Sequence, residues 1–224
     1  MEKKLILKIL KELREKSPKR KFPQTIDLLA NLKNLDLKKQ DHKIDLYLQL
    51  PSGTGKKRSV CAFVDAQLEA KAKESCDRVI TKSEFDNYKN SKKEQRNLAE
   101  SHDFFISQVE VMAKVASVFG KVLGSRGKMP NPKAGCVVPG AIQSLGSIVK
   151  KLQLTTRLQT KNELSVKVAV GTENMKDEEI AENILAVYNA LLQALPQDKN
   201  NIRYFAVKFT MGPLLKIEEV QPKK

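Results

Sequence analysis

The sequence predicts an α/β protein of two domains, in which both termini build a split α+β sandwich domain and the middle forms an inserted, Rossmann-like open α/β domain. The outer segments alternate apolar and polar residues with a period of two, which is typical of strands with one covered face. The middle instead places short apolar runs between helices, as in a parallel sheet covered on both faces. The expected split domain is residues 1–61 and 156–224, and the expected insert is 62–155, with two connections acting as a hinge.

The first outer segment predicts one helix and two strands. Apolar residues recur at helical spacing from Leu5 to Leu13, and Ser17-Pro18 ends this amphipathic helix because proline blocks its continuation. Strict alternation then predicts strands over residues 26–33 and 44–50. A turn rich in glycine closes the segment before a basic run.

The middle of the chain alternates apolar strands with helices. Three apolar runs predict buried strands, at residues 60–64, 78–80 and 104–106. Helices are expected between and after them, at residues 67–75, 83–100 and 109–119. Glycines and prolines then predict an irregular, exposed loop from Gly120 to Gly140, followed by a helix over residues 141–151.

The last outer segment predicts a strand, a helix and a strand. Alternating valines give the strand at 163–171, and a run of acidic residues opens a helix that Pro196 ends. The final strand is expected over residues 202–210, and the Met211-Gly212-Pro213 turn stops it.

The charge balance favours an anionic partner. The 224 residues include 41 Lys and Arg against 26 Asp and Glu, a formal net charge of +15. The first 60 residues hold 16 basic and 7 acidic side chains, and four of the basic ones fall within the six positions from Lys16 to Lys21. Such a cluster attracts nucleic acid first and acidic lipid or protein second, although a solvated basic face is the simpler interpretation. No apolar run approaches the roughly 18 residues of a spanning helix, and we expect neither membrane insertion nor secretion.

We expect no catalytic residue, metal or cofactor. The three cysteines show no Cys-x-x-Cys spacing and the two histidines show no metal-ligand spacing, so the cysteines are expected to be thiols in a reducing cytoplasm. The Gly-Lys pairs at Gly55, Gly120 and Gly127 each lack the first glycine and the hydroxyl residue of a phosphate loop. No Gly-x-Ser-x-Gly elbow is present either.

The basic loop from Gly120 to Gly140 leaves alternatives open. Its glycines allow backbone amides to approach phosphate, and Arg126, Lys128 and Lys133 supply charge. It could instead be a structural hairpin with solvated lysines. An α/β enzyme that binds a phosphorylated small molecule through this loop is the alternative function, and a general polyanion-binding protein is another.

Four segments together resemble the archaeal-type branch of the large-subunit ribosomal protein L-one family, the protein of the mobile ribosomal stalk. Along the chain they are KRKFPQTIDLLANLKNLDLKK, LPSGTGKK, GKVLGSRGKMPNPKAG and FTMGP. This is the family's order, and together they cover nearly the whole chain. Two positions depart from the family's pattern. Gly124-Ser125-Arg126 stands where Gly-Pro-Arg is usual, and Phe209 stands where a small hydroxyl residue is often found.

The resemblance implies a non-enzymatic protein of the cytoplasmic ribosome. The terminal domain would bind the stalk region of large-subunit ribosomal RNA, and the insert would be mobile. The protein would assist release of deacylated tRNA from the exit site and would repress translation of its own mRNA through the same interface. We expect it to be a monomer when free.

The implied RNA site lies on the first and last long strands, which would run side by side. It consists of Lys21, Phe22 and Thr25 at one end and Thr210, Met211 and Gly212 at the other, with Lys19 as a further phosphate contact. Lysines neutralise phosphate, threonine hydroxyls bond sugar or phosphate oxygens, and glycine admits the RNA backbone. Phe22 would contact a ribose or base unless it is a core residue. Arg126, Lys128 and Lys133 of the insert would contact tRNA or a neighbouring RNA secondarily.

Overall fold

The computed structural model describes residues 2–39, 42–140 and 145–217, and the chain forms two compact units. Unit 1 comprises Met1–Lys56 with Leu154–Lys224, and unit 2 comprises Lys57–Gln153. The division differs slightly from the expected one, because the expected cuts after residues 61 and 155 fall inside strands β3 (Val60–Val64) and β7 (Thr155–Gln159). Each of these strands belongs wholly to the unit that contains its hydrogen-bonded partner.

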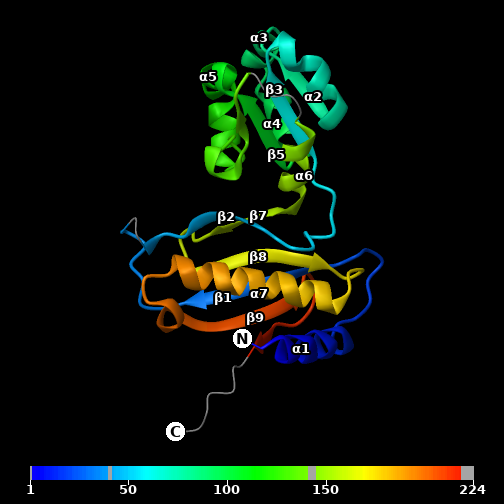
Figure 1. The fold of residues 1–224 in the computed structure, drawn as a ribbon, viewed down its shortest axis with the longest axis vertical. Coiled ribbons are helices and arrows are strands. Elements are labelled where there is room, and N and C mark those ends of the chain that lie inside the picture. The colour runs from blue at the N-terminus through cyan, green and yellow to red at the C-terminus, as the bar shows by residue number, and fades with distance from the viewer. Residues whose placement is uncertain (1, 40–41, 141–144, 218–224) are drawn as a thin grey trace. The chain divides into compact units, whose positions relative to one another are not determined.

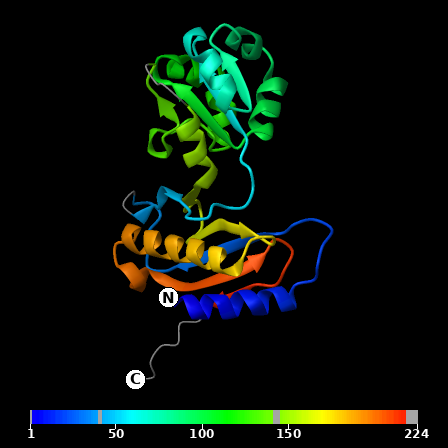
Figure 2. The same ribbon diagram turned by 45° about the vertical axis from the view of Figure 1, so that its right-hand side comes forward.

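Unit 1 is built on a four-stranded antiparallel sheet with the order β10-β9-β1-β8. The strands are β1 (Thr25–Leu32), β8 (Ser165–Thr172), β9 (Ile202–Phe209) and β10 (Leu215–Ile217). Helices α1 (Lys3–Lys16) and α7 (Asp177–Ala194) run along this sheet (Figures 1 and 2). Every second residue of β1 is buried, and these side chains form one core with the apolar faces of α1 and α7. The alternate side chains of β1 stay partly exposed on the other face.

A separate two-stranded antiparallel sheet completes unit 1. Strand β2 (Asp45–Gln49) pairs with β7 over its whole length. The sequence predicts β2 from its alternation, but β7 was missed because TTRLQ contains a single large apolar residue, Leu158. Strand β10 was missed because three residues are too few to show a period.

Unit 2 is an open parallel sheet with the order β4-β3-β5-β6. Its strands are β3, β4 (Arg78–Thr81), β5 (Phe104–Gln108) and β6 (Val137–Val138). The helices are α2 (Glu69–Ser75), α3 (Phe85–Lys89), α4 (Lys92–Ser101), α5 (Met112–Ser125) and α6 (Gly146–Leu154). Successive residues of β3 contribute to two different cores, one on each face of the sheet: Phe63 joins Phe85 and Phe119, whereas Ala62 joins Ile106. The strands of this sheet are therefore continuous apolar runs because both faces of the sheet are covered, as the sequence suggests.

Three predictions in unit 2 were wrong in detail. The expected helix over 83–100 is two helices, because the chain turns at Asn90 and the Ser91 hydroxyl accepts the Glu94 amide at 3.4 Å to begin α4. The first part of the expected loop is helical, since α5 continues to Ser125 past Gly120 and Gly124. Helix α6 begins at Gly146, and residues 141–144 of the helix expected there lie outside the described residues.

Candidate nucleic-acid interface

The start of β1 and the end of β9 lie side by side, as expected from the resemblance. Ile26 faces Phe209 across the antiparallel pair. The Thr210 amide donates to the Thr25 carbonyl at 3.0 Å. The Thr210 hydroxyl accepts the Thr25 amide and is placed to donate to the Thr25 carbonyl, each at 3.2 Å. This hydroxyl therefore holds the start of β1 against the end of β9, at the junction of Thr25 with Thr210. One lone pair of its oxygen remains for an outside donor such as a ribose 2′-hydroxyl.

A buried glutamine holds the loop that follows Thr210. Gln24 is 2% exposed, and its Oε1 accepts the Met211 amide at 3.2 Å. The Glu173 amide donates to the Gln24 carbonyl at 2.9 Å and the Glu173 carboxylate accepts the Gln24 amide at 3.2 Å. Gln24 thus joins three loops at one end of the sheet. Sequence reasoning missed it, because a polar residue between Pro23 and Thr25 gives no signal of burial.

Gly212 is required by packing within the chain. A Cβ atom at this position would lie 2.8 Å from the Ser17 Oγ and 3.1 Å from the Phe209 Cβ. The Gly212 amide donates to the Phe209 carbonyl at 3.0 Å, which closes the turn. The turn therefore packs tightly against the end of α1, an intramolecular reason for glycine beside the expected approach of RNA.

Apolar and basic side chains are exposed around this junction. Phe22 is 48% exposed and Met211 is 59% exposed, so Phe22 is not a core residue. Of the five large apolar side chains that are exposed among the described residues, these two and Leu214 lie on the two joined segments. Lys19 and Lys21 are also exposed, and neither forms an ion pair with any described residue. Phe209 points the other way and is buried, so its departure from the family's pattern removes no side chain from the exposed surface.

The glycine-rich turn of residues 51–55 is followed by Lys56, a further cation at this end of the sheet. Thr172 pairs with Thr25, and a Cβ on Gly55, whose φ is +72°, would lie 2.6 Å from the Thr172 Oγ1. Fully buried Asn183 holds the turn by donating to the Gly53 carbonyl at 2.7 Å and accepting the Ser52 amide at 3.1 Å. Lys56 follows this turn and is exposed. Sequence reasoning did not select Lys56, although the GTGKK turn was a signal for it.

Asp27 lies among lysines on the partly exposed face of the sheet. Burial raises the pKa of Asp27, and the positive charges of Lys208 and Lys56 oppose that rise. Asp27 faces Lys208 directly across the β1–β9 pair. Asp27 therefore lies beside two lysines on the face next to the junction, and the Glu173 carboxylate lies at the same end of the sheet.

The three predicted cations of the insert have different surroundings. Lys128 is half-buried, and its Nζ donates to the Ala99 carbonyl at 2.8 Å and the His102 carbonyl at 2.7 Å, where it closes the end of α4. Arg126 pairs with the Glu100 carboxylate. Lys133 is exposed on a short 3-10 turn at Pro132–Ala134. Two donor hydrogens of Lys128 are therefore engaged within unit 2, where they stabilise its fold.

Burial keeps the three cysteines in the thiol form. Burial raises the pKa of Cys76 and of Cys136 to about 11 and raises that of Cys61 further, so all three are protonated thiols at neutral pH. Among the described residues, no three His, Cys, Asp or Glu side chains gather as metal ligands would. In this part of the chain no helix has the length and hydropathy to span a bilayer.

Comparison with known proteins gives consistent matches along the chain. A family model described as the ribosomal protein L1p/L10e family matches residues 11–213. The large ribosomal subunit protein uL1 of Pyrococcus abyssi is 38% identical over 213 residues, covering 95% of each chain. The same-named protein of Thermococcus kodakarensis is 36% identical over 213 residues, covering 95% of this chain and 96% of its own. That of Methanocaldococcus jannaschii is 34% identical over 224 residues, covering all of both chains.

Proposed function

The chain belongs to the ribosomal protein L1p/L10e family, and we propose that it binds the stalk region of large-subunit ribosomal RNA through the junction of Thr25 with Thr210. Its archaeal relatives carry the name of a large-subunit ribosomal protein, and this chain has the corresponding structural role in the ribosome. The finer proposal is which RNA it contacts and with which residues.

The observation that carries the proposal is the composition of the exposed surface at the junction. Phe22 and Met211 expose apolar side chains beside Lys19 and Lys21, on two segments that hydrogen bonds of Thr210 and Gln24 join. Folded RNA offers ribose and base faces next to phosphates, so a mixed apolar and basic surface fits it better than a purely basic one does. Preformed backbone geometry also lowers the entropy cost of binding.

One further role of the protein rests on the same interface, and another involves unit 2. We propose that it assists release of deacylated tRNA from the exit site and that it represses translation of its own mRNA, whose RNA structure would mimic the stalk site. Unit 2 would act as a mobile insert on its two connections. These roles require only that unit 1 hold one RNA while unit 2 remains free to contact another.

A binding titration of the purified protein tests the proposal. It compares a stalk fragment of large-subunit RNA with a length-matched RNA duplex at low and high salt. A shaped site predicts a preference for the stalk fragment that survives high salt, because apolar and hydrogen-bond contacts are not screened. Equal binding to both RNAs that vanishes with salt would leave the net charge of +15 as the only cause.

A further inference from the structure

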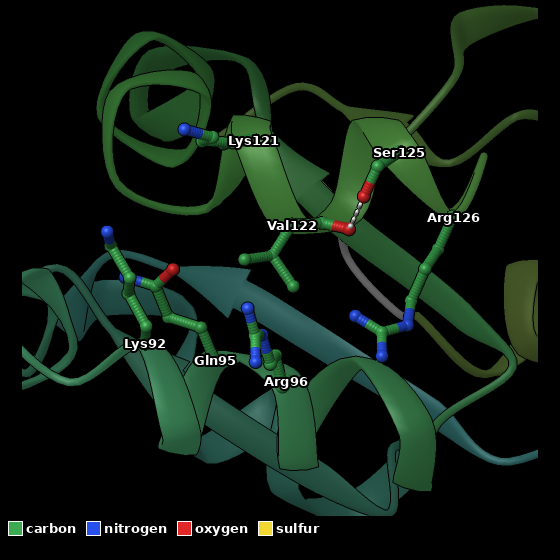
Figure 3. Close-up of a pocket in the computed structure, with 7 residues that line it drawn as sticks. All are labelled: Lys92, Gln95, Arg96, Lys121, Val122, Ser125 and Arg126. Atoms are coloured by element: carbon green, nitrogen blue, oxygen red, sulfur yellow. Dashed lines mark hydrogen bonds between the residues drawn. The ribbon is translucent and has the colours of Figure 1, made fainter.

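A groove between two helices of unit 2 gathers cations that the sequence does not place together. Helix α4 contributes Lys92, Gln95 and Arg96, and the end of α5 contributes Lys121, Val122 and Ser125, with Arg126 directly after it (Figure 3). The groove has a volume of about 280 Å³. Lys92 and Arg96 are one helical turn apart, as are Lys121 and Ser125, so each helix presents one stripe to the groove.

Packing of the helices fixes this arrangement. Helix α4 buries Leu98 and Ala99, and α5 buries Val115, Phe119 and Leu123, all of them in the same aromatic core of unit 2. Both helices are anchored by that core, so their polar stripes meet along one side. Arg96 and Arg126 direct their guanidinium groups into the groove, and Lys92 and Lys121 flank its other end (Figure 3).

The charges in the groove are poorly compensated. Glu100 pairs with Arg126. Among the described residues, Lys92, Arg96 and Lys121 form no hydrogen bond or ion pair through their side chains. Four cations therefore share one groove with a single carboxylate, and their mutual repulsion is relieved when an anion enters. Val122 and the largely buried Gln95 also line the groove.

We infer that this groove binds the phosphodiester backbone of RNA, as a second RNA site that is separate from the junction of Thr25 with Thr210. The choice of RNA as the polyanion rests on the proposed ribosomal function. The volume lies just below the roughly 300–1,000 Å³ of small-molecule pockets, which suits a phosphate with its sugar. Val122 offers an apolar surface for a ribose, and the cations lie on either side for successive phosphates.

A small phosphorylated ligand fits the groove less well. Sites for such ligands use backbone amides at a helix N-terminus or in a glycine-rich turn. The first turn of α4 is closed by the Ser91 hydroxyl, and the groove is lined instead by long, exposed basic side chains. Such side chains follow an extended polyanion without fixing one phosphate geometry.

Salt titrations of a labelled RNA duplex, with matched variants of the full chain, test this inference. The groove variant is Arg96→Gln with Lys121→Gln, and the control is Lys71→Gln with Lys150→Gln, two exposed lysines on α2 and α6 of the same unit. Both variants lose two charges, and glutamine is well tolerated in helices. Thermal unfolding followed by circular dichroism confirms that both are folded.

The two variants should differ in affinity and in salt dependence. The groove variant should bind the duplex about tenfold more weakly near 0.1 M salt, and its slope of log affinity against log salt should fall by about two. The control should retain the wild-type slope. Equal losses of affinity in both variants would show that only net charge matters and would overturn the proposal.

Amide NMR spectra of the full chain identify the ligand and separate this site from the proposed function. The duplex should shift the side-chain amide of Gln95 and the backbone amides of Ser125 and Arg126. If inorganic phosphate, ATP or polyglutamate shifts them as strongly, the groove is a general anion site and the RNA assignment is wrong. Absence of a preference for the stalk fragment, with an intact groove response, would overturn only the function proposed for unit 1.

Discussion

The side-chain amide of Gln153 bonds both backbone groups of Arg58. Its Oε1 accepts the Arg58 amide at 2.7 Å, and its Nε2 donates to the Arg58 carbonyl at 2.7 Å. These residues lie where the chain enters and leaves unit 2, so one side chain ties the two connections together within that unit.

Replacing Gln153 should therefore destabilise unit 2. Gln153→Ala leaves the Arg58 amide and carbonyl without this partner, and it should lower the free energy of unfolding by about 1–3 kcal/mol. Urea unfolding monitored by a probe in each unit measures the effect. Gln153→Glu keeps the acceptor for the Arg58 amide but sets a carboxylate oxygen against the Arg58 carbonyl, so it should also destabilise unit 2. An alanine variant as stable as wild type would contradict this role.

The Thr210 hydroxyl should matter for both stability and RNA binding. Thr210→Val removes the hydroxyl that bonds both backbone groups of Thr25, whereas Thr210→Ser keeps it. We expect the valine variant to lose about 1 kcal/mol of stability and about 1–3 kcal/mol of affinity for the stalk fragment. Urea unfolding and fluorescence anisotropy check these values. Valine and serine variants with equal affinity would remove the hydroxyl from the site.

Crowding at Gly212 predicts a compensating pair. Gly212→Ala places a Cβ 2.8 Å from the Ser17 Oγ, so it should destabilise the chain by about 1–3 kcal/mol. Ser17→Ala removes that oxygen, which is buried without a hydrogen-bond partner among the described residues. The double variant should recover part of the stability in thermal unfolding. Additive destabilisation in the double variant would mean that the clash with Phe209 dominates instead.

The lysines before β1 should contribute charge without sequence preference. Lys19→Gln with Lys21→Gln should weaken binding to the stalk fragment and to a duplex alike, and should lower the salt slope by about one for each phosphate that the protein no longer neutralises. Lys161→Gln with Lys199→Gln removes the same charge from exposed positions elsewhere in unit 1 and serves as the control. If only the stalk fragment were affected, the phosphate role of these lysines would be wrong.

Asp27 predicts a pH dependence of stability. Burial raises its pKa in the folded chain, so the folded state binds this proton more tightly than the unfolded state does. Its contribution to stability is present below the ordinary pKa of 3.8 and is lost as the pH rises through the raised pKa. Asp27→Asn should therefore be more stable than wild type at neutral pH, and the gain should shrink in acid. Urea unfolding of both proteins at neutral pH and in acid measures this difference in stability. A gain that grows in acid would contradict the prediction.

Much of the architecture followed from local patterns, and the exceptions have physical causes. Alternation predicts β1 and β8 because their buried residues largely alternate with more exposed ones. The mostly polar β7 gave no such signal, since its position is set by pairing with β2. Gly120 and Gly124 suggested a loop because glycine has a weak helix propensity. Both lie in α5, where the packing of Val115, Phe119 and Leu123 in the core outweighs that propensity. Neither glycine is required by close packing, since a Cβ at either position would meet no atom within 4 Å.

The candidate sites were predictable only in part. The resemblance gave Thr25 and Thr210, and the structure shows them paired. It could not show that the Thr210 hydroxyl is engaged with the backbone or that Lys128 bonds two carbonyls, because both depend on residues distant in sequence. The groove depends on the packing of α4 against α5, so neither stripe alone indicated it.

Hydrogen exchange of the full chain, with and without the stalk fragment of large-subunit RNA, is the decisive test of RNA binding at the junction of Thr25 with Thr210. We expect new protection in two segments, residues 19–25 and 210–214, because bound RNA would cover the exposed junction. Protection should be strongest around Phe22 and Met211. Protection confined to unit 2, or none in these two segments while the RNA is bound, would contradict binding at this junction.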